Sequence, residues 1–313
     1  MNEWFLPFLL LAGSVVVIFK AGEKTTTYAA LLARQLGVSD LAIGFILLSA
    51  ATSLPELVVS VSAAFRGATD LSVGNVFGAN LVNVSLVVGV AAFLGVVHIK
   101  RKETGNLVMV LLATSLISLL MVVYNPNRLA GAGLLLVYLA YVYWLLVHSG
   151  RARADAKRAP PSLHSLAPPL SKFSFFIALV IVAAQVAVDN AIALSQTWGV
   201  AETVIGATIV SLGTTLPELS VSVVSALKRR ESMAIGNAVG SAITNLSLVF
   251  GTALVINPQI SFAPAVQLVV FSVIANIVLL YFIVIRGGLQ KRDGLLLIFG
   301  YLAFFIIQFL GGG

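Results

Sequence analysis

The chain has 313 residues, of which 59% are hydrophobic and only 10% charged, and its mean hydropathy is +1.04. Because a soluble domain is about 25% charged and long apolar runs recur here from end to end, we expect an all-α polytopic membrane protein. The chain contains no cysteine, which excludes disulfides and thiolate metal sites. Its three histidines fall near predicted loops, which argues against a histidine-based metal or catalytic centre.

Ten apolar segments are long enough to cross a bilayer, which takes about 20 helical residues. The first lacks a basic start and a small-residue cleavage site, so we expect a retained span rather than a signal peptide. The predicted helices lie near residues 3–20, 40–65, 72–98, 105–124, 129–149, 173–196, 202–227, 233–256, 263–285 and 294–310.

A basic, proline-rich stretch divides the predicted helices into two groups of five. Residues 150–172 carry four prolines, and we predict an extended cytoplasmic linker there. The first five-helix unit then covers residues 1–149 and the second covers residues 173–313.

Lysine and arginine are distributed unevenly among the predicted connections. Of the 19 basic residues, only Arg66 and Arg128 fall in even-numbered connections. Cytoplasmic loops carry the basic excess, so we predict that the odd-numbered connections are cytoplasmic and that both termini face outside. The net charge of +7 therefore reflects topology rather than nucleic-acid binding.

The two units are related by an internal repeat. Residues 37–89 and 199–251 share 22 identities in 53 positions without a gap, at a constant offset of 162. Because each unit has an odd number of spans, we predict that the second inserts upside down relative to the first. Inverted repeats with interrupted helices at matching positions are typical of secondary transporters, whose binding site lies near the bilayer midplane.

One stretch of the repeat, ATSLPEL at 51–57 and GTTLPEL at 213–219, puts a proline and a glutamate inside an apolar run. A carboxylate at that depth is costly and indicates a functional site. Proline donates no backbone hydrogen bond, so we predict that helices 2 and 7 are broken and that carbonyls four residues earlier are freed. Free carbonyls at membrane depth are tolerated where they line a cavity or hold an ion.

The polar groups beside these prolines carry only oxygen. Two carboxylates, four hydroxyls and the freed carbonyls suit a hard cation such as Ca²⁺, which takes about six to eight oxygen ligands, and two carboxylates neutralise its charge. The alternatives are a structural pair satisfied by hydroxyls and a proton-relay acid. The residues are Thr52, Ser53, Glu56, Thr214, Thr215 and Glu218.

The following helix of each unit carries a second polar stripe. We interpret Asn83 and Asn245 as cavity-lining, and leave Asn75 and Asn237 open between ligand support and helix packing. The G-x-x-x-G spacings on the same helices are interpreted as packing. Asp189, in the sixth span, is either a cavity carboxylate or a residue near the outer interface.

In the first unit TSLPEL is followed, in the next predicted helix, by GNVFGANLVN; in the second unit TTLPEL is followed by GNAVGSAITN. These paired motifs resemble the two alpha-repeats of the calcium/cation antiporter superfamily. The resemblance is strongest to prokaryotic sodium/calcium exchangers. It implies ten helices, of which the first and sixth are long tilted gating helices that slide past a core. It also implies a central diamond of cation sites that sodium and calcium occupy in turn.

The resemblance further implies a role for each matching residue. Glu56 and Glu218 would bind both ions, and the carbonyls of Thr52 and Thr214 would complete the calcium site. Asn83 and Asn245 would line the middle position. The flanking sodium sites would use hydroxyls of Thr52, Ser53, Thr214, Thr215 and Ser241 and carbonyls of Ser49 and Ser211.

The chain departs from the family pattern at two positions. Ala79 stands where the family usually has serine, so one flanking sodium site lacks a hydroxyl. Asn245 stands where some relatives have aspartate, so the cavity holds one fewer acid. The G-N-x-x-E setting typical of proton/calcium exchangers is absent, which favours sodium as the coupling ion.

We therefore predict a plasma-membrane antiporter, not an enzyme, that exchanges Ca²⁺ for Na⁺ by alternating access. We expect it to act as a monomer, without a cofactor, ATP or nucleic acid, and to have the two ions and the lipid bilayer as its partners. Open alternatives are an H⁺- or K⁺-coupled exchanger of Ca²⁺ or another divalent cation, a cation channel, and an intramembrane enzyme that uses the two glutamates as an acid–base pair.

Overall fold

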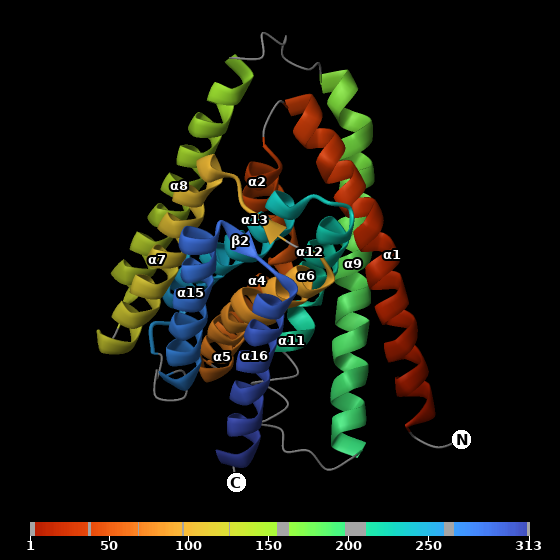
Figure 1. Cartoon of the computed structure of the whole chain (residues 1–313). Helices are drawn as coiled ribbons and strands as arrows, with labels where there is room; N and C mark the ends of the chain where they lie inside the picture. The colour runs from red at the N-terminus through yellow and green to blue at the C-terminus, as the bar shows by residue number, and fades with distance from the viewer. Residues whose placement is uncertain are drawn as a thin grey trace.

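The structure, a computed structural model, describes residues 4–36, 39–67, 69–95, 97–124, 126–154, 163–197, 211–259 and 266–311. Nearly all of these residues are helical (Figure 1). Seven segments are long and apolar enough to cross a membrane, and Asp40–Thr52 with Leu54–Phe65, bent by 41°, makes an eighth if the pair is one span. The expectation of a mostly helical, multi-pass membrane protein is confirmed.

The elements follow one another as long helices and as shorter helices joined end to end. The first unit contains α1 (Phe5–Leu36), α2 (Asp40–Ile43), η1 (Gly44–Leu48), α3 (Ser49–Thr52), α4 (Leu54–Phe65), α5 (Thr69–Leu81), η2 (Val82–Val87), α6 (Val88–Leu94), β1 (Val97–His98), α7 (Arg101–Val123) and α8 (Arg128–Ala154). The second contains α9 (Leu163–Thr197), α11 (Ser211–Thr214), α12 (Leu216–Leu227), α13 (Glu231–Thr244), η4 (Asn245–Val249), α14 (Phe250–Ile256), α15 (Val266–Arg286), β2 (Gly288–Leu289) and α16 (Lys291–Gly311).

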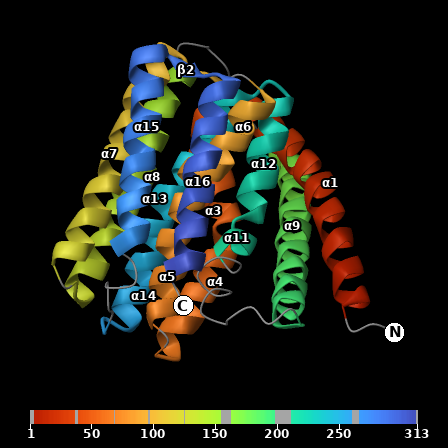
Figure 2. The ribbon, with the colours of Figure 1, turned by 60° about the horizontal axis from the view of Figure 1, so that its bottom comes forward.

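The helices form an inner and an outer layer. In an apolar 18-residue stretch of Ser72–Leu94 and of Glu231–Ile256, 83% and 78% of the residues are buried, against only 28% and 22% in such stretches of Arg101–Val123 and Arg128–Val147. The outer helices expose apolar side chains, as expected for surfaces that face lipid. The inner segments carry the polar stripe of each repeat, so those amides are buried inside the fold. Figure 2 shows the same helices after a 60° turn.

Glycines allow the inner segments to approach closely. A Cβ on Gly236 would lie 2.7 Å from the Leu41 carbonyl oxygen, and one on Gly240 would lie 2.9 Å from the Phe45 Cα. A Cβ on Gly44 would lie 2.6 Å from the Met233 carbonyl oxygen. The second G-x-x-x-G therefore serves helix packing, as its spacing predicted.

Helices α1 and α9 lie side by side along their length in both views (Figures 1 and 2). The rings of Tyr28 and Phe176 stack with centroids 5.9 Å apart, and the Lys172 ammonium lies 5.6 Å from the centre of the Tyr28 ring. Buried Phe173, Ile177 and others pack in the same apolar cluster as residues of α1. This pair contacts the rest of the molecule largely through α12.

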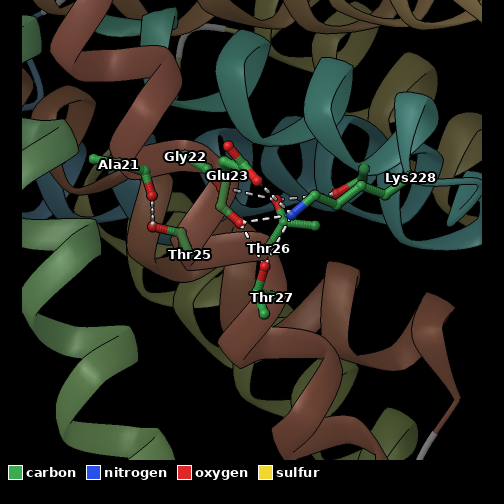
Figure 3. A network of polar contacts seen from close by, with 8 residues as sticks. Ala21, Gly22, Glu23, Thr25, Thr26, Thr27 and Lys228 are labelled. Atoms are coloured by element: carbon green, nitrogen blue, oxygen red, sulfur yellow. Dashed lines mark hydrogen bonds and ion pairs between the residues drawn. The ribbon is translucent and has the colours of Figure 1, made fainter.

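The first helix is longer than predicted. The expected helix at 3–20 continues to Leu36, so Lys20 and Lys24 lie on a helix rather than in a connection. Three threonine hydroxyls satisfy carbonyls of the preceding turn: Thr25 donates to Ala21, Thr26 to Gly22 and Thr27 to Glu23, at 3.0, 3.0 and 2.8 Å (Figure 3). Because both lysine side chains are exposed, the charges do not interrupt the helix.

The predicted extended linker at 150–172 is also largely wrong. Helix α8 continues to Ala154 and α9 begins at Leu163, while 155–162 lie outside the described residues. Pro168 and Pro169 lie in the second turn of α9, beyond the four unpaired N–H groups of the helix start, so each removes one backbone hydrogen bond. Packing of the following turns against α1 keeps the segment helical.

Two short strands join the connections after α6 and α15. Val97 pairs with Leu289 and His98 with Gly288 in an antiparallel register. Gly287 has a φ of +69°, a conformation that favours glycine. The pairing ties two connections of the predicted repeat to each other.

Candidate cation-binding site

The helix that contains the first Pro-Glu pair is interrupted at Ser53, between α3 and α4. Pro55 is the second residue of α4, where a missing N–H is tolerated because the first N–H groups of a helix have no intrahelical partner. The backbone of Ser53 has a φ of −79° and a ψ of 7°. Glu56 follows in the first turn of α4 and is fully buried.

The second Pro-Glu pair has the same local structure. Thr215 lies between α11 and α12 with a φ of −84° and a ψ of 1°, and Pro217 is the second residue of α12. Glu218 lies in the first turn of α12 and is fully buried. Both predicted interruptions therefore occur, although residues 202–210 of predicted helix 7 lie outside the described residues.

Neither buried carboxylate has a basic partner. In the described part of the chain the ion pairs involve other acids, and both oxygens of Glu56 and Oε2 of Glu218 lack a hydrogen-bond partner. Only Oε1 of Glu218 is bonded, accepting from the Ser53 hydroxyl at 3.2 Å. The two carboxylates are also close enough to interact electrostatically. Buried acids of this kind need a bound cation or a proton.

The hydroxyls around the two carboxylates differ. In the part of the chain that the structure describes, no hydroxyl bonds to either oxygen of Glu56, whereas Glu218 accepts from the Ser53 hydroxyl. Ala79, fully buried, occupies the repeat position of Ser241 and supplies no hydroxyl. The Glu56 carboxylate therefore accepts fewer hydrogen bonds than the Glu218 carboxylate.

Asn237 joins the two units beside the site. Its amide nitrogen donates to the Glu218 carbonyl oxygen at 3.3 Å and to the Ser222 hydroxyl at 2.9 Å. Its side-chain oxygen accepts from the Thr52 hydroxyl, in the other unit, at 3.3 Å. Both ends of the amide are thus engaged with protein groups.

Asn75 makes the same contacts at an offset of 162 residues. Its amide nitrogen donates to the Glu56 carbonyl oxygen at 3.2 Å and to the Ser60 hydroxyl at 2.9 Å. Its side-chain oxygen accepts from the Thr214 hydroxyl at 3.2 Å. These bonds join the helix of Asn75 to both carboxylate-bearing turns, so they fit both interpretations, ligand support and helix packing.

Asn83 and Asn245 differ from that pair because their amides are unpartnered. Asn83 lies in the π-helical segment η2 and Asn245 is the first residue of η4. Both are fully buried, and neither amide nitrogen nor oxygen has a hydrogen-bond partner. Widened helical turns are frequent at functional sites, and orphaned amide oxygens are available ligands. Their role in lining the ion path stays a prediction.

The remaining predicted ligands lie on the turns before the two interruptions. The Ser49 carbonyl accepts from the Ser53 N–H at 3.0 Å, and the Ser211 carbonyl accepts from the Thr215 N–H at 3.3 Å. The Thr215 hydroxyl also donates to the Ser211 carbonyl. The Ser211 carbonyl accepts from the Thr214 hydroxyl as well, at 3.2 Å, and the Ser49 carbonyl from the Thr52 hydroxyl at 3.5 Å. Because a carbonyl oxygen has two lone pairs, an ion at either carbonyl would replace a hydroxyl donor.

Several polar residues lie elsewhere or were not predicted. Asp189 is exposed and accepts from Gln185 at 3.0 Å, which excludes it as a buried cavity carboxylate. Glu103, on α7, is 4% exposed and accepts from the Ser232 hydroxyl at 2.7 Å. Glu103 follows Arg101 and Lys102 in the first turn of α7, and this charged sequence did not predict that its side chain would be buried.

The described residues contain no group of three or more His, Cys, Asp and Glu side chains suited to a metal. A cation here would thus be held by two carboxylates with neutral hydroxyl, carbonyl and amide oxygens. That set matches a hard cation that binds and leaves rather than a permanently held metal. The unpartnered oxygens of Glu56, Glu218, Asn83 and Asn245 are the structural observation that fits such an ion.

Known proteins resemble this chain in both fold and sequence. A solved structure of the sodium-calcium exchanger NCX_Mj superposes with a TM-score of 0.83, at 23% identity over 98% of both chains. The inner membrane protein YrbG of Escherichia coli is 32% identical over 80% of this chain and 79% of its own. The sodium/calcium exchanger MaX1 of Methanosarcina acetivorans is 28% identical over 96% of this chain and 98% of its own.

The family model for sodium/calcium exchanger protein matches residues 6–147 and 170–310, which include both Pro-Glu stretches and most of the remaining helices. The match confirms the resemblance to the calcium/cation antiporter superfamily that the two repeat motifs indicated. The chain belongs to the sodium/calcium exchanger protein family.

Proposed function

We propose that this protein is a secondary antiporter that exchanges Ca²⁺ for Na⁺ by alternating access. The observation that carries the proposal is the pair of fully buried, ion-pair-free carboxylates of Glu56 and Glu218, on interrupted helices at matching repeat positions. Because one set of oxygens serves both ions, binding of one displaces the other, and this competition couples the two fluxes. No step requires a covalent intermediate, so the proposal is a transporter rather than an enzyme.

The proposed architecture is ten transmembrane helices in two inverted five-helix repeats. The exchange of equivalent hydrogen bonds through Asn75 and Asn237 supports a two-fold relation between the units. Asn276 on α15 donates to the Thr114 hydroxyl on α7 at 3.2 Å, and these two residues are themselves 162 apart. Repeat-related residues contact each other only near the axis that relates the repeats, as expected for this class of transporter.

The proposed ligands follow the geometry of the two interruptions. Glu56 and Glu218 bind Ca²⁺ or Na⁺, with the carbonyls of Thr52 and Thr214 completing the calcium site. Asn83 and Asn245 line the middle position. The flanking sodium sites use Ser49, Ser53, Thr52, Ser211, Thr214, Thr215 and Ser241.

We further propose that the odd-numbered connections are cytoplasmic and that the plasma membrane is the location. Contacts between these connections support their lying on one side: Arg230 pairs with Asp40 at 2.9 Å, and the Ile99 N–H donates to the Gly287 carbonyl at 3.0 Å. In this proposal the α1–α9 pair is the moving element, since it packs chiefly on itself and on α12. A monomer contains the whole site.

Uptake of radiolabelled calcium into proteoliposomes tests the proposal. Vesicles loaded with Na⁺, with K⁺, or carrying only a pH gradient are compared, without an added ionophore. Uptake that requires internal Na⁺ supports sodium coupling. Uptake that ignores Na⁺ and follows the pH gradient or K⁺ assigns the same site to the alternative coupling ion, and uptake without any counter-ion indicates a channel.

A further inference from the structure

The basic end of α12 reaches across to α1. Lys228, the residue that ends α12, places its ammonium 2.9 Å from the Thr27 hydroxyl, 3.3 Å from the Glu23 carbonyl oxygen and 3.3 Å from Glu23 Oε1 (Figure 3). Its side chain is 34% exposed. Lys228 thus links the first helix to the helix that carries Glu218.

Two surface cavities meet at this lysine. One, of about 410 Å³, is lined by Thr26, Thr27, Arg34, Lys228 and Arg230 with two apolar residues of α1. The other, of about 460 Å³, is lined by Val16, Phe19, Val224 and Leu227 together with Lys20, Glu23 and Lys228. Lys228 is common to both, so a ligand long enough can occupy the two together.

The first cavity carries an excess of positive charge. It is lined by three basic side chains and no acid. Lys228 is paired with Glu23, and Arg230 with Asp40 at 2.9 Å. Arg34 forms no ion pair within the described residues and is exposed. Guanidinium and ammonium groups beside a threonine hydroxyl are the donors that bind a phosphate group.

The second cavity has an apolar wall. Val16, Phe19 and Leu227 are 60%, 38% and 58% exposed in a protein whose outer helices face lipid. Along α1 this wall precedes the polar cavity, because Val16 and Phe19 lie several turns before Arg34. The order along the helix is therefore apolar, then cationic, which matches an acyl chain followed by a charged headgroup.

We propose that an anionic phospholipid binds at the α1–α12 contact, with its phosphate at Arg34, Lys228 and Arg230 and an acyl chain along Val16, Phe19 and Leu227. Phosphate and Glu23 compete for the Lys228 ammonium, so an occupied site loosens the link between α1 and α12. If the proposed exchange cycle is correct, the lipid also alters the exchange rate, because one of the two helices carries Glu218. The binding itself does not depend on that cycle.

Native mass spectrometry of the detergent-purified full chain tests the binding directly. The protein is titrated with dioleoylphosphatidylglycerol, with dioleoylphosphatidylcholine, or with inorganic phosphate. Arg34→Gln removes the unpaired cation of the cavity at an exposed site, and Arg292→Gln is the matched control, since Arg292 is exposed on α16 and lines neither cavity. Size-exclusion profiles verify that both variants fold.

We expect Arg34→Gln to bind the first phosphatidylglycerol on the order of tenfold more weakly than the wild type, the factor expected for one charge-assisted contact. Arg292→Gln should bind like the wild type, and phosphatidylcholine should be retained poorly. Equal retention of phosphatidylglycerol by Arg34→Gln and wild type overturns the proposal, as does equal retention of phosphatidylcholine. Displacement of the lipid by inorganic phosphate at equal concentration reassigns the cavity to a soluble anion. These binding results do not depend on the proposed exchange activity, so they remain interpretable if the protein does not exchange calcium.

Discussion

The Thr52 hydroxyl donates to the side-chain oxygen of Asn237 across a distance of 3.3 Å, joining residues that are 185 positions apart in the chain. The equivalent bond runs from Thr214 to Asn75 at 3.2 Å. Each asparagine also donates to the backbone carbonyl of the glutamate in its own unit: Asn75 to Glu56, and Asn237 to Glu218. The two carboxylate-bearing turns are therefore positioned by one another, which pre-organises the site before an ion enters.

Asn237→Ala should destabilise the protein and lower exchange. The substitution leaves the buried Thr52 and Ser222 hydroxyls with fewer partners, and we expect a loss of about 1–3 kcal/mol in the free energy of unfolding. Thermal unfolding in detergent and initial calcium uptake are the measurements. Asn80→Ala is the control, because Asn80 is buried but its side-chain oxygen has no partner. Equal effects of the two substitutions would contradict a specific role for Asn237.

Glu56→Gln and Glu218→Gln should each abolish calcium exchange and the stabilisation by calcium. An ion that binds only the folded state adds about 2.7 kcal/mol at a concentration 100 times its Kd, and this gain is lost on chelation. We therefore expect a calcium-dependent shift of Tm in the wild type and none in either variant. Glu103→Gln is the matched control, since Glu103 is buried on another helix and bonded to Ser232. A variant that keeps full exchange would remove its glutamate from the site.

Ala79→Ser should change the sodium dependence of exchange. It restores a hydroxyl at the repeat position of Ser241, in the unit of Glu56, whose two carboxylate oxygens accept no hydrogen bond from the described residues. A contact of about 1 kcal/mol shifts the sodium concentration for half-maximal exchange roughly fivefold. Ser241→Ala should shift it in the opposite direction. An unchanged sodium curve in Ala79→Ser would mean that this position only packs.

Gly236→Ala should be destabilising by about 1–3 kcal/mol, the usual cost of inserting a carbon into a packed core. Its Cβ would lie 2.7 Å from the Leu41 carbonyl oxygen, which cannot move without shifting the helix that leads to Thr52. Gly133→Ala is the control, because Gly133 is exposed on α8 with nothing within 4 Å of a Cβ. We expect that variant to be neutral or slightly stabilised. Unfolding temperatures and size-exclusion profiles in detergent measure both, and a neutral Gly236→Ala would contradict the close contact.

Much of the architecture could be predicted because hydropathy and local breaks are local properties. Apolar runs indicated a multi-pass helical protein, of which the described residues contain seven or eight candidate spans. Pro55 and Pro217 located the interruptions, since a missing N–H acts within one turn. Helix ends were predicted less well. Residues 20–36 and the start of α9 remain helical because the two helices pack on each other, and packing between segments far apart in the chain is not visible in local sequence.

By itself the sequence determined that the chain is a membrane protein with two related halves, each carrying one costly glutamate, because composition and an offset of 162 residues need no coordinates. Only the tertiary structure decided which polar groups are already satisfied. Asn75 and Asn83 are both buried asparagines on consecutive segments of one run. The first bonds to its own unit through its nitrogen and to the other unit through its oxygen, whereas the second has no partner among the described residues. Glu103 and Glu56 are likewise both buried, but Glu103 accepts a hydrogen bond from Ser232 and Glu56 accepts none from the described residues. Hydrogen bonds between residues far apart in the chain depend on packing, and packing determines which oxygens remain available to an ion.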